Sequence, residues 1–251
     1  MKHLLNIIQV LIIATMIIVC ANTVASELPS LSPDIRNNIS DDEISNRIMF
    51  IQSRFDQGKL HAQLWQYGWL SGFSATVASR LYIVANEDDT PERFDATIGI
   101  FTALSGVLSV ALKPLPSSSA AAKLRAMPEA TTDQRRIKLQ YGEQLLMASA
   151  HEAKRRRGWT IQSVFLLEQL IAGLAIGMID NRPKDGLKTA VTGMLASELF
   201  TFTMPTKSIS DLNTYSKNLF KNMPTSPSSK RLFLNPHITP QARGIQMIYF
   251  F

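Results

Sequence analysis

The residues best suited to chemistry in this sequence form one basic run. The run consists of Lys154, Arg155, Arg156 and Arg157, and Trp159 opens an apolar segment two positions later. Cations beside a tryptophan at the start of an apolar helix are typical of a segment that meets anionic lipid headgroups, where each charge contributes about 1 kcal/mol. A solvated helix face without a ligand is the alternative. Nucleic-acid binding fits less well, because an apolar segment follows the run directly.

Three ionisable side chains interrupt segments that are otherwise apolar, namely Arg80, Glu168 and Glu198. A charge at the centre of a bilayer costs roughly 3 kcal/mol to insert, so such groups usually face a protein interior and often mark ion or proton pathways. If the helices that carry Glu168 and Glu198 pack antiparallel, the two carboxylates can approach each other or Arg80. A hydrogen bond inside a helix bundle, or a face turned to water, is the alternative.

No pattern typical of a catalytic or metal centre occurs in the sequence. His151 and Glu152 are not followed by a second histidine four positions on, and His61 and His237 have no partner at ligand spacing. The sequence also has no phosphate-binding glycine loop, nucleophile elbow or dinucleotide fingerprint. We therefore expect no enzymatic activity, no cofactor and no bound metal.

The overall composition limits the class of protein. The 251 residues, 45% of them hydrophobic and 18% charged, are enough for one large domain or two small ones and exclude a disordered chain. The single cysteine excludes a disulfide scaffold. A mean hydropathy of +0.03 is too low for a chain built only of membrane helices, and the pI is about 9.5. The net charge is +6.

The first residues have the order of a secretory signal. A basic start precedes an apolar stretch over 4–21, and small residues follow. We therefore assign 1–26 to a signal peptide and expect an exported protein, in the cell membrane or periplasm of a bacterial-type envelope. An uncleaved anchor is the alternative, because 18 apolar residues just span a bilayer. Cys20 suggests a lipoprotein signal, but Val19 stands where such signals have a small residue.

Capping and proline signals divide residues 41–205 into two similar halves. A capping box over 40–43 starts the first long helix, and a Thr-Pro pair starts a short apolar helix after it. Thr131 starts a second long helix that no proline interrupts before Asp180, and another short apolar helix follows. Two helical hairpins, each a long helix plus a short one, are therefore predicted as an architectural repeat.

The predicted fold is mainly α, with six parts in chain order. They are the signal peptide or uncleaved anchor at 1–26, an irregular leader at 27–40, helical hairpin 1 at 41–114, a linker at 115–131, helical hairpin 2 at 132–205 and a basic tail at 206–251. We expect the hairpins to form a four-helix bundle embedded in a membrane. The tail carries six of the 26 basic residues and one acid. It is expected to be small and irregular, with short strands.

The last residues of the tail carry one resemblance. Ile245, Met247, Tyr249 and Phe251 alternate with other residues, and Phe251 is terminal. This resembles the carboxy-terminal strand of bacterial outer-membrane barrels, which implies engagement with the outer membrane. The upstream sequence lacks the alternating strands of about 10 residues that a barrel needs. We therefore favour a tail strand that packs on its own domain.

Small residues at helical spacing favour packing of the hairpins within a membrane. They recur three or four positions apart in the apolar segments, where they let helix backbones approach closely. The glycines expected at such contacts are Gly68, Gly72, Gly99, Gly106, Gly173 and Gly177. Aromatic residues lie at segment ends, as in an interfacial aromatic belt; they are Trp65, Tyr67, Trp69 and Trp159. A soluble bundle with close glycine contacts is the alternative.

The charges of the loops conflict with four simple spans. An exported amino terminus places loop 86–95 inside and segment 113–158 outside. The first holds five acids and one base, and the second holds ten bases and four acids, which reverses the positive-inside rule. The hairpins therefore enter the membrane without crossing it, or not every apolar segment is a span, or the amino-terminal assignment is wrong.

These patterns together predict a non-enzymatic membrane protein of a bacterial-type cell envelope, with a structural or assembly role. Two alternatives come from other classes: a small transporter or channel that uses Arg80, Glu168 and Glu198, and a soluble exported helical binding module. Membrane lipids are the expected partners, with a second copy of the chain or other envelope proteins as further candidates. Nucleic acid is not expected as a partner.

Overall fold

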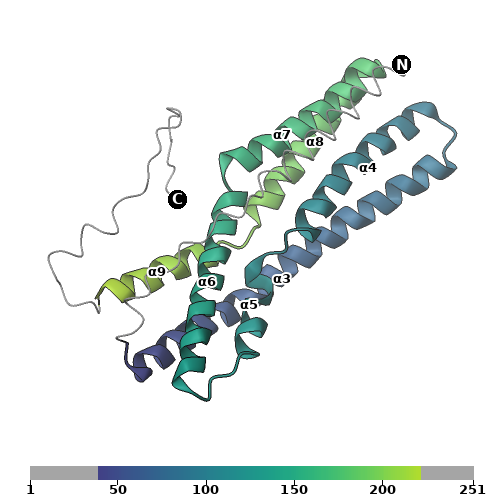
Figure 1. The fold of residues 1–251 in the computed structure, drawn as a ribbon. Helices are drawn as coiled ribbons and strands as arrows, with labels where there is room; N and C mark the ends of the chain where they lie inside the picture. The colour runs from purple at the N-terminus through teal and green to yellow at the C-terminus, as the bar shows by residue number, and fades with distance from the viewer. Residues whose placement is uncertain (1–38, 222–251) are drawn as a thin grey trace. The chain divides into compact units, whose positions relative to one another are not determined.

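The computed structural model describes residues 39–221, and this part of the chain is helical without any strand (Figure 1). The elements are α3 (Asp41–Asn86), α4 (Thr90–Ala111), α5 (Pro116–Arg125), α6 (Thr132–Arg156), α7 (Trp159–Leu174), the π-helical turn η1 (Ala175–Ile179), α8 (Pro183–Phe202) and α9 (Lys207–Lys221). The prediction of a mainly α fold is confirmed for these residues. The signal peptide, nearly all of the leader and the predicted tail strands lie outside the described residues.

The chain divides into two compact units, and the boundary falls inside α9. The first unit contains the described residues up to Asn213 and therefore every helix before α9. The second unit begins at Thr214, and its described part is the end of α9. This helix corrects the prediction of a wholly irregular tail, because residues 207–221 of the 206–251 tail are helical.

The first predicted hairpin is formed by α3 and α4. The side chain of Ser40 accepts a hydrogen bond from the backbone N–H of Glu43 at 3.3 Å, and three acids follow in the first turn, where the helix dipole favours negative charge. The helix ends at Asn86 because Glu87 is extended, and α4 begins with a proline in its first turn. α4 then folds back and packs along α3 (Figure 1).

The predicted linker at 115–131 is not a simple linker, because α5 occupies much of it. Pro116 suits the first turn of a helix, and the three consecutive alanines that follow favour helix. Ala120, Ala121 and Leu124 are buried, and α5 packs against α3 and α6. Burial of this apolar face against α3 and α6 stabilises the helix, and the serine-rich sequence did not reveal this contact.

The first half of α3 packs with α5 and α6 around a buried apolar core. We call these three helical segments the base. Ile44, Ile48, Ile51 and Phe55 recur every three or four residues and are all nearly inaccessible to solvent. A Cβ atom on Gly142 of α6 would lie 3.3 Å from Leu124 of α5. The three helices therefore meet closely around this stripe.

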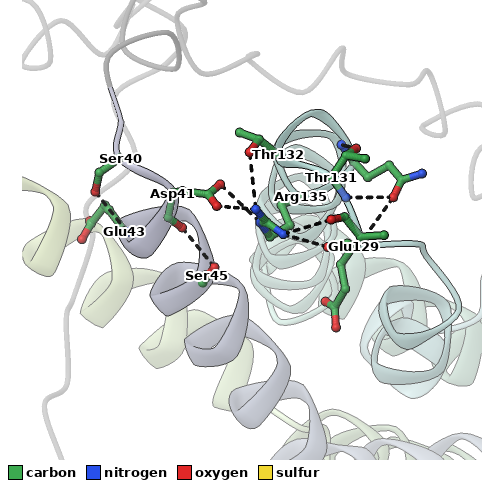
Figure 2. Close-up of polar contacts among 10 residues, drawn as sticks. Ser40, Asp41, Glu43, Ser45, Glu129, Thr131, Thr132 and Arg135 are labelled. Atoms are coloured by element: carbon green, nitrogen blue, oxygen red, sulfur yellow. Dashed lines mark hydrogen bonds and ion pairs between the residues drawn. The ribbon is translucent and has the colours of Figure 1, made fainter.

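Polar contacts join the starts of α3 and α6 at the end of the base (Figure 2). The guanidinium of Arg135 on α6 donates to the carboxylate of Asp41 on α3, with Nε 3.3 Å from Oδ1, and to the backbone carbonyl of Glu129 at 3.0 Å. The hydrogen bond from Arg135 lowers the pKa of Asp41. Thr131 and Gln134 form a capping box, so the predicted start of this helix is confirmed.

The predicted long helix over 132–180 is wrong, because it breaks between α6 and α7. Gly158 is extended, with φ −70° and ψ 148°, and serves as the N-cap of α7. The break changes the partners of the two pieces: α6 packs mainly on α3 and α5, whereas α7 packs along α8 (Figure 1). The second helix pair is therefore α7 with α8, and it contacts the first pair through α4 and α7.

Candidate functional site

The basic run divides into an exposed and a buried part. Lys154 and Arg157 are exposed, and Trp159 is 75% exposed at the start of α7. Arg155 is half-buried, and Arg156 is only 6% exposed. The prediction of four equivalent lipid-facing cations is therefore wrong for Arg156, because the turn of the helix points this side chain into the protein.

Arg156 is the centre of a polar junction between the base and the apolar helices. Its Nε donates to Glu152 at 2.6 Å, and its Nη2 donates to the carbonyl oxygens of Ser109, at 3.3 Å, and Lys113 at the end of α4. The guanidinium also lies 5.9 Å from the ring centroid of Trp65. These contacts satisfy carbonyls that a helix end leaves without intrahelical partners.

Glu152 holds the two neighbouring arginines together. Its carboxylate accepts hydrogen bonds from Arg155 at 2.8 and 2.9 Å in addition to the bond from Arg156. Burial acts to raise the pKa of Glu152, but the hydrogen bonds and charges of both arginines outweigh it and lower the pKa to about 2. Glu152 is therefore ionised at neutral pH, and two of the four cations of the basic run are paired within the protein.

The three charges predicted to gather in the apolar helices do not meet. Glu168 points inward and accepts a hydrogen bond from the hydroxyl of Ser105 on α4 at 3.1 Å. Glu198 is exposed on α8. Arg80 is partly buried and lies against Gly99, where a Cβ atom would be 3.1 Å from its Nε. Glu198 is therefore corrected from a buried to an exposed charge, since α8 turns other residues toward α7.

Glu168 lines a cavity of about 200 Å³ that is formed by α3, α4, α7 and α8. Aromatic rings, hydroxyl groups and small residues make up the rest of its wall, among them Phe73, Thr102, Phe165, Ser197 and Phe200. Glu168 is the one ionisable group among the described residues of this wall. This cavity is the candidate functional site.

An aromatic cluster positions one side of the cavity. Phe200 of α8 lies at its centre, with ring centroids 5.3 Å from Trp69 and 5.8 Å from both Phe73 and Phe165. The indole N–H of Trp65 donates to the backbone carbonyl of Phe200 at 3.1 Å. Trp65 is therefore a core residue that holds α8 on α3, and its predicted place in an interfacial belt is wrong.

The six glycines predicted at helix contacts fall into three groups. A Cβ atom on Gly68 or Gly72 would meet no described atom within 4 Å, so the prediction is wrong for these two. Gly106 is covered by the ring of Phe73, 2.7 Å from where its Cβ would lie. A Cβ on Gly173 would lie 2.5 Å from the backbone oxygen of Gly186 on α8. The close contact between α7 and α8 is therefore real.

Two further predicted glycines make looser contacts. Gly99 meets the side chain of Arg80, and a Cβ on Gly177 would lie 3.6 Å from the backbone of Pro183. Gly186 and Gly193 were missed as packing residues. Gly186 closes the contact with Gly173, and the amide of Gln169 covers Gly193. Their small size in or beside an apolar helix was the available signal in the sequence.

A second polar contact that the sequence did not reveal lies at the turn before α8. Arg182 donates to Asp95 of α4 at 3.1 Å, to Asp180 at 2.7 Å and to Asp185 at 3.2 Å. Asp95 is 87 residues away in the chain, so no local pattern predicts this pair. The contact ties the start of α4 to the turn between η1 and α8.

The outer faces of the helices around the cavity are apolar. α8 exposes one stripe at helical spacing, and α7 exposes another; they comprise Leu187, Val191, Leu195, Leu199 and Phe202 on α8 and Leu167, Leu170, Leu174 and Met178 on α7 and η1. Among the described residues, two stretches are long and apolar enough to cross a membrane, Thr90–Arg125 and Trp159–Ile179. Only 28% and 22% of their most apolar windows are buried in the fold.

Comparison of the chain with protein families, with curated proteins and with solved structures gives no match.

Proposed function

We propose that the chain is a non-enzymatic membrane protein of a bacterial-type cell envelope with a structural or assembly role. In this proposal α4, α7, α8 and the second half of α3 lie in the bilayer, and the base lies in water. The observation that carries it is the exposed apolar stripe of α8. Such a continuous apolar face is unfavourable in water by about 25 cal/mol per Å² and is typical of contact with lipid or another protein.

The interior of the same helices supports the proposal. Ser105, Glu168 and Gln169 lie on the inner faces of α4 and α7, where they meet each other or neighbouring helices. Apolar residues outside and polar residues inside are expected for helices in a bilayer, which has no water to hydrogen-bond a polar group. Glu198, exposed on α8 beside the apolar stripe, is an exception to this arrangement. The base differs, because the stripe of Ile44 and Ile51 is buried there and charged residues such as Asp42 and Arg136 are exposed, although Lys138 is buried.

The exposed part of the basic run fits the boundary between these two regions. Lys154 lies in the last turn of α6, Arg157 follows this helix, and Trp159 begins the first apolar turn of α7. Cations and an indole at this level suit anionic headgroups and the aromatic belt. Membrane lipids are therefore the proposed partners. The transporter alternative is not adopted, because Arg80 and Glu198 do not join Glu168 in the cavity.

A pair of matched substitutions tests the membrane placement. Leu195 on α8 is 65% exposed, and Ile137 on α6 of the base is 59% exposed. Leu195→Glu should disrupt integration into membranes, because a carboxylate at the centre of a bilayer costs roughly 3 kcal/mol. Ile137→Glu should have almost no effect, since it exchanges one group in water for another. Extraction of membranes with alkaline carbonate measures both.

Two outcomes of the carbonate extraction would contradict the membrane placement. If wild-type protein is released into the carbonate supernatant, or if Leu195→Glu stays in the membrane as fully as Ile137→Glu, the stripe of α8 does not face lipid.

A second experiment tests the two exposed cations of the basic run. The purified double variant that carries Lys154→Ala and Arg157→Ala should float less with anionic vesicles than wild type at low salt. Equal flotation excludes the contribution of these two charges to lipid binding.

A further inference from the structure

We propose that the cavity between α3, α4, α7 and α8 binds a small organic ammonium ion, held by the carboxylate of Glu168 and by the rings of Phe73, Phe165 and Phe200. The cavity lies between these four helices, whereas the proposed function depends on their outer faces. The proposal of a bound cation therefore goes beyond the proposed function and does not depend on whether the outer faces contact lipid.

The charge of the cavity selects a cation. Glu168 accepts one hydrogen bond from Ser105 at 3.1 Å, and it forms no ion pair with any residue of the described part of the chain. Removing a carboxylate from water without a compensating charge is unfavourable, and a bound cation restores the balance. An anionic ligand would meet repulsion here, because no basic side chain lines the wall.

The aromatic wall selects an organic cation over a hydrated metal ion. Phe73, Phe165 and Phe200 come from three different helices and line the same cavity, with Phe73 and Phe165 both 5.8 Å from Phe200 by ring centroids. The negative face of an aromatic ring attracts an alkylammonium group within about 6 Å, and several rings together form a cage for such groups. A metal ion would instead need several oxygen ligands, and one carboxylate with scattered hydroxyls does not supply a full set.

The size of the cavity limits the ligand to a few heavy atoms. Its volume of about 200 Å³ lies below the ~300–1,000 Å³ of pockets for drug-sized ligands. It is comparable with the ~150 Å³ cavity that accommodates benzene in another protein. Thr76 on α3 and Ala196 on α8 line the cavity and are exposed. The cavity therefore opens to the surface between these two helices, which gives a ligand its entrance.

Equilibrium dialysis of the detergent-purified full-length protein with radiolabelled tetramethylammonium tests the inference. We expect saturable binding of one ion per chain in excess sodium chloride. Neopentyl alcohol, a neutral molecule of similar shape, should not compete. Glu168→Gln should weaken binding roughly tenfold or more, because it removes the charge and keeps the shape. Glu198→Gln is the matched control, since it removes one exposed carboxylate of α8, and it should leave the affinity unchanged.

Phe73→Leu provides a second test of the aromatic cage. It should weaken tetramethylammonium binding severalfold while the protein remains monodisperse, because leucine keeps an apolar wall without the ring face. The inference is overturned if wild type shows no saturable binding, if neopentyl alcohol competes as well as the cation, or if Glu168→Gln and Glu198→Gln have equal effects. If Glu168→Gln does not fold, Phe73→Leu with the neutral competitor decides the question alone.

Discussion

The guanidinium of Arg156, in the last turn of α6, donates a hydrogen bond to the backbone carbonyl of Ser109, in the last turn of α4, at 3.3 Å. The two residues are 47 positions apart in the chain. The same guanidinium is paired with Glu152 and contacts the carbonyl of Lys113. One side chain thus joins the C-terminal ends of two helices, at the place where the base meets the apolar helices.

Arg156→Ala should lower the free energy of unfolding by about 1–3 kcal/mol, because it leaves the carbonyls of Ser109 and Lys113 without this donor and leaves Glu152 paired with Arg155 alone. Arg157→Ala is the control, since Arg157 is exposed, and its effect should stay within about 0.5 kcal/mol. Urea unfolding in detergent, followed by tryptophan fluorescence, measures both. Equal effects of the two variants would show that the Arg156 junction does not stabilise the fold.

The pairing of Glu152 predicts a dependence of stability on acid. The pKa of Glu152 is lowered from 4.5 to about 2, so its ionised form is favoured in the folded state. Its contribution is fully present above the unfolded pKa near 4.5 and is lost as the pH falls toward 2. Glu152→Gln should therefore have a smaller free energy of unfolding than wild type at neutral pH. The difference in the free energy of unfolding between the two proteins should narrow as the pH falls from 4.5 to 2.

The measurement is a series of unfolding curves for both proteins across this pH range. Taking the difference in the free energy of unfolding between the two proteins removes the contribution of the other carboxylates. A difference that stays constant from neutral pH down to pH 2 would contradict the assignment of the lowered pKa to Glu152.

Two glycines of the apolar helices should respond to alanine in opposite directions. Gly173→Ala should destabilise the protein by roughly 1–3 kcal/mol, because its Cβ would lie 2.5 Å from the backbone oxygen of Gly186. Gly72→Ala should stabilise it by up to about 1 kcal/mol, since its Cβ meets open space and alanine favours helix. Thermal unfolding in detergent gives both signs. A stabilising Gly173→Ala would show that α7 and α8 do not pack through this glycine.

The pair of Arg182 and Asp95 should couple in a double-mutant cycle. Arg182→Ala and Asp95→Ala should each be destabilising, and the double variant should be less destabilised than their sum by about 1 kcal/mol. Both side chains are about a quarter exposed, which limits the effect. Arg93→Ala, at an exposed position of α4 two residues before Asp95, is the control and should change stability little. A coupling energy near zero would show that the pair does not stabilise the turn before α8.

Much of the helical structure could be predicted because its signals are local. The hydroxyl of Ser40 and the capping box at Thr131 act within one turn, and the proline that starts α4 acts on its own backbone. The alternation of apolar and polar segments depends only on composition along the chain. These features determine where helices start and which segments are apolar, and they do so without any distant contact.

Tertiary contacts decided the features that sequence analysis missed. Gly72 and Gly173 look alike in sequence, yet only Gly173 faces a neighbouring helix. Glu168 and Glu198 are similar carboxylates in apolar segments, but the rotation of α7 and α8 turns one inward and the other outward.

Tertiary contacts also decided the break between α6 and α7 at Gly158. The basic last turn of α6 and the glycine after it are local signals that allow a helix to end, and the tertiary contacts favour an end here, because α6 packs on α3 and α5, whereas α7 packs along α8. The chain must change direction between these two sets of partners, and glycine fits at this position because a Cβ atom would lie only 3.1 Å from the backbone oxygen of Arg155. The sequence by itself determined the helical segments, whereas the burial of side chains from distant segments decided where they bend, which faces meet and which charge enters the cavity.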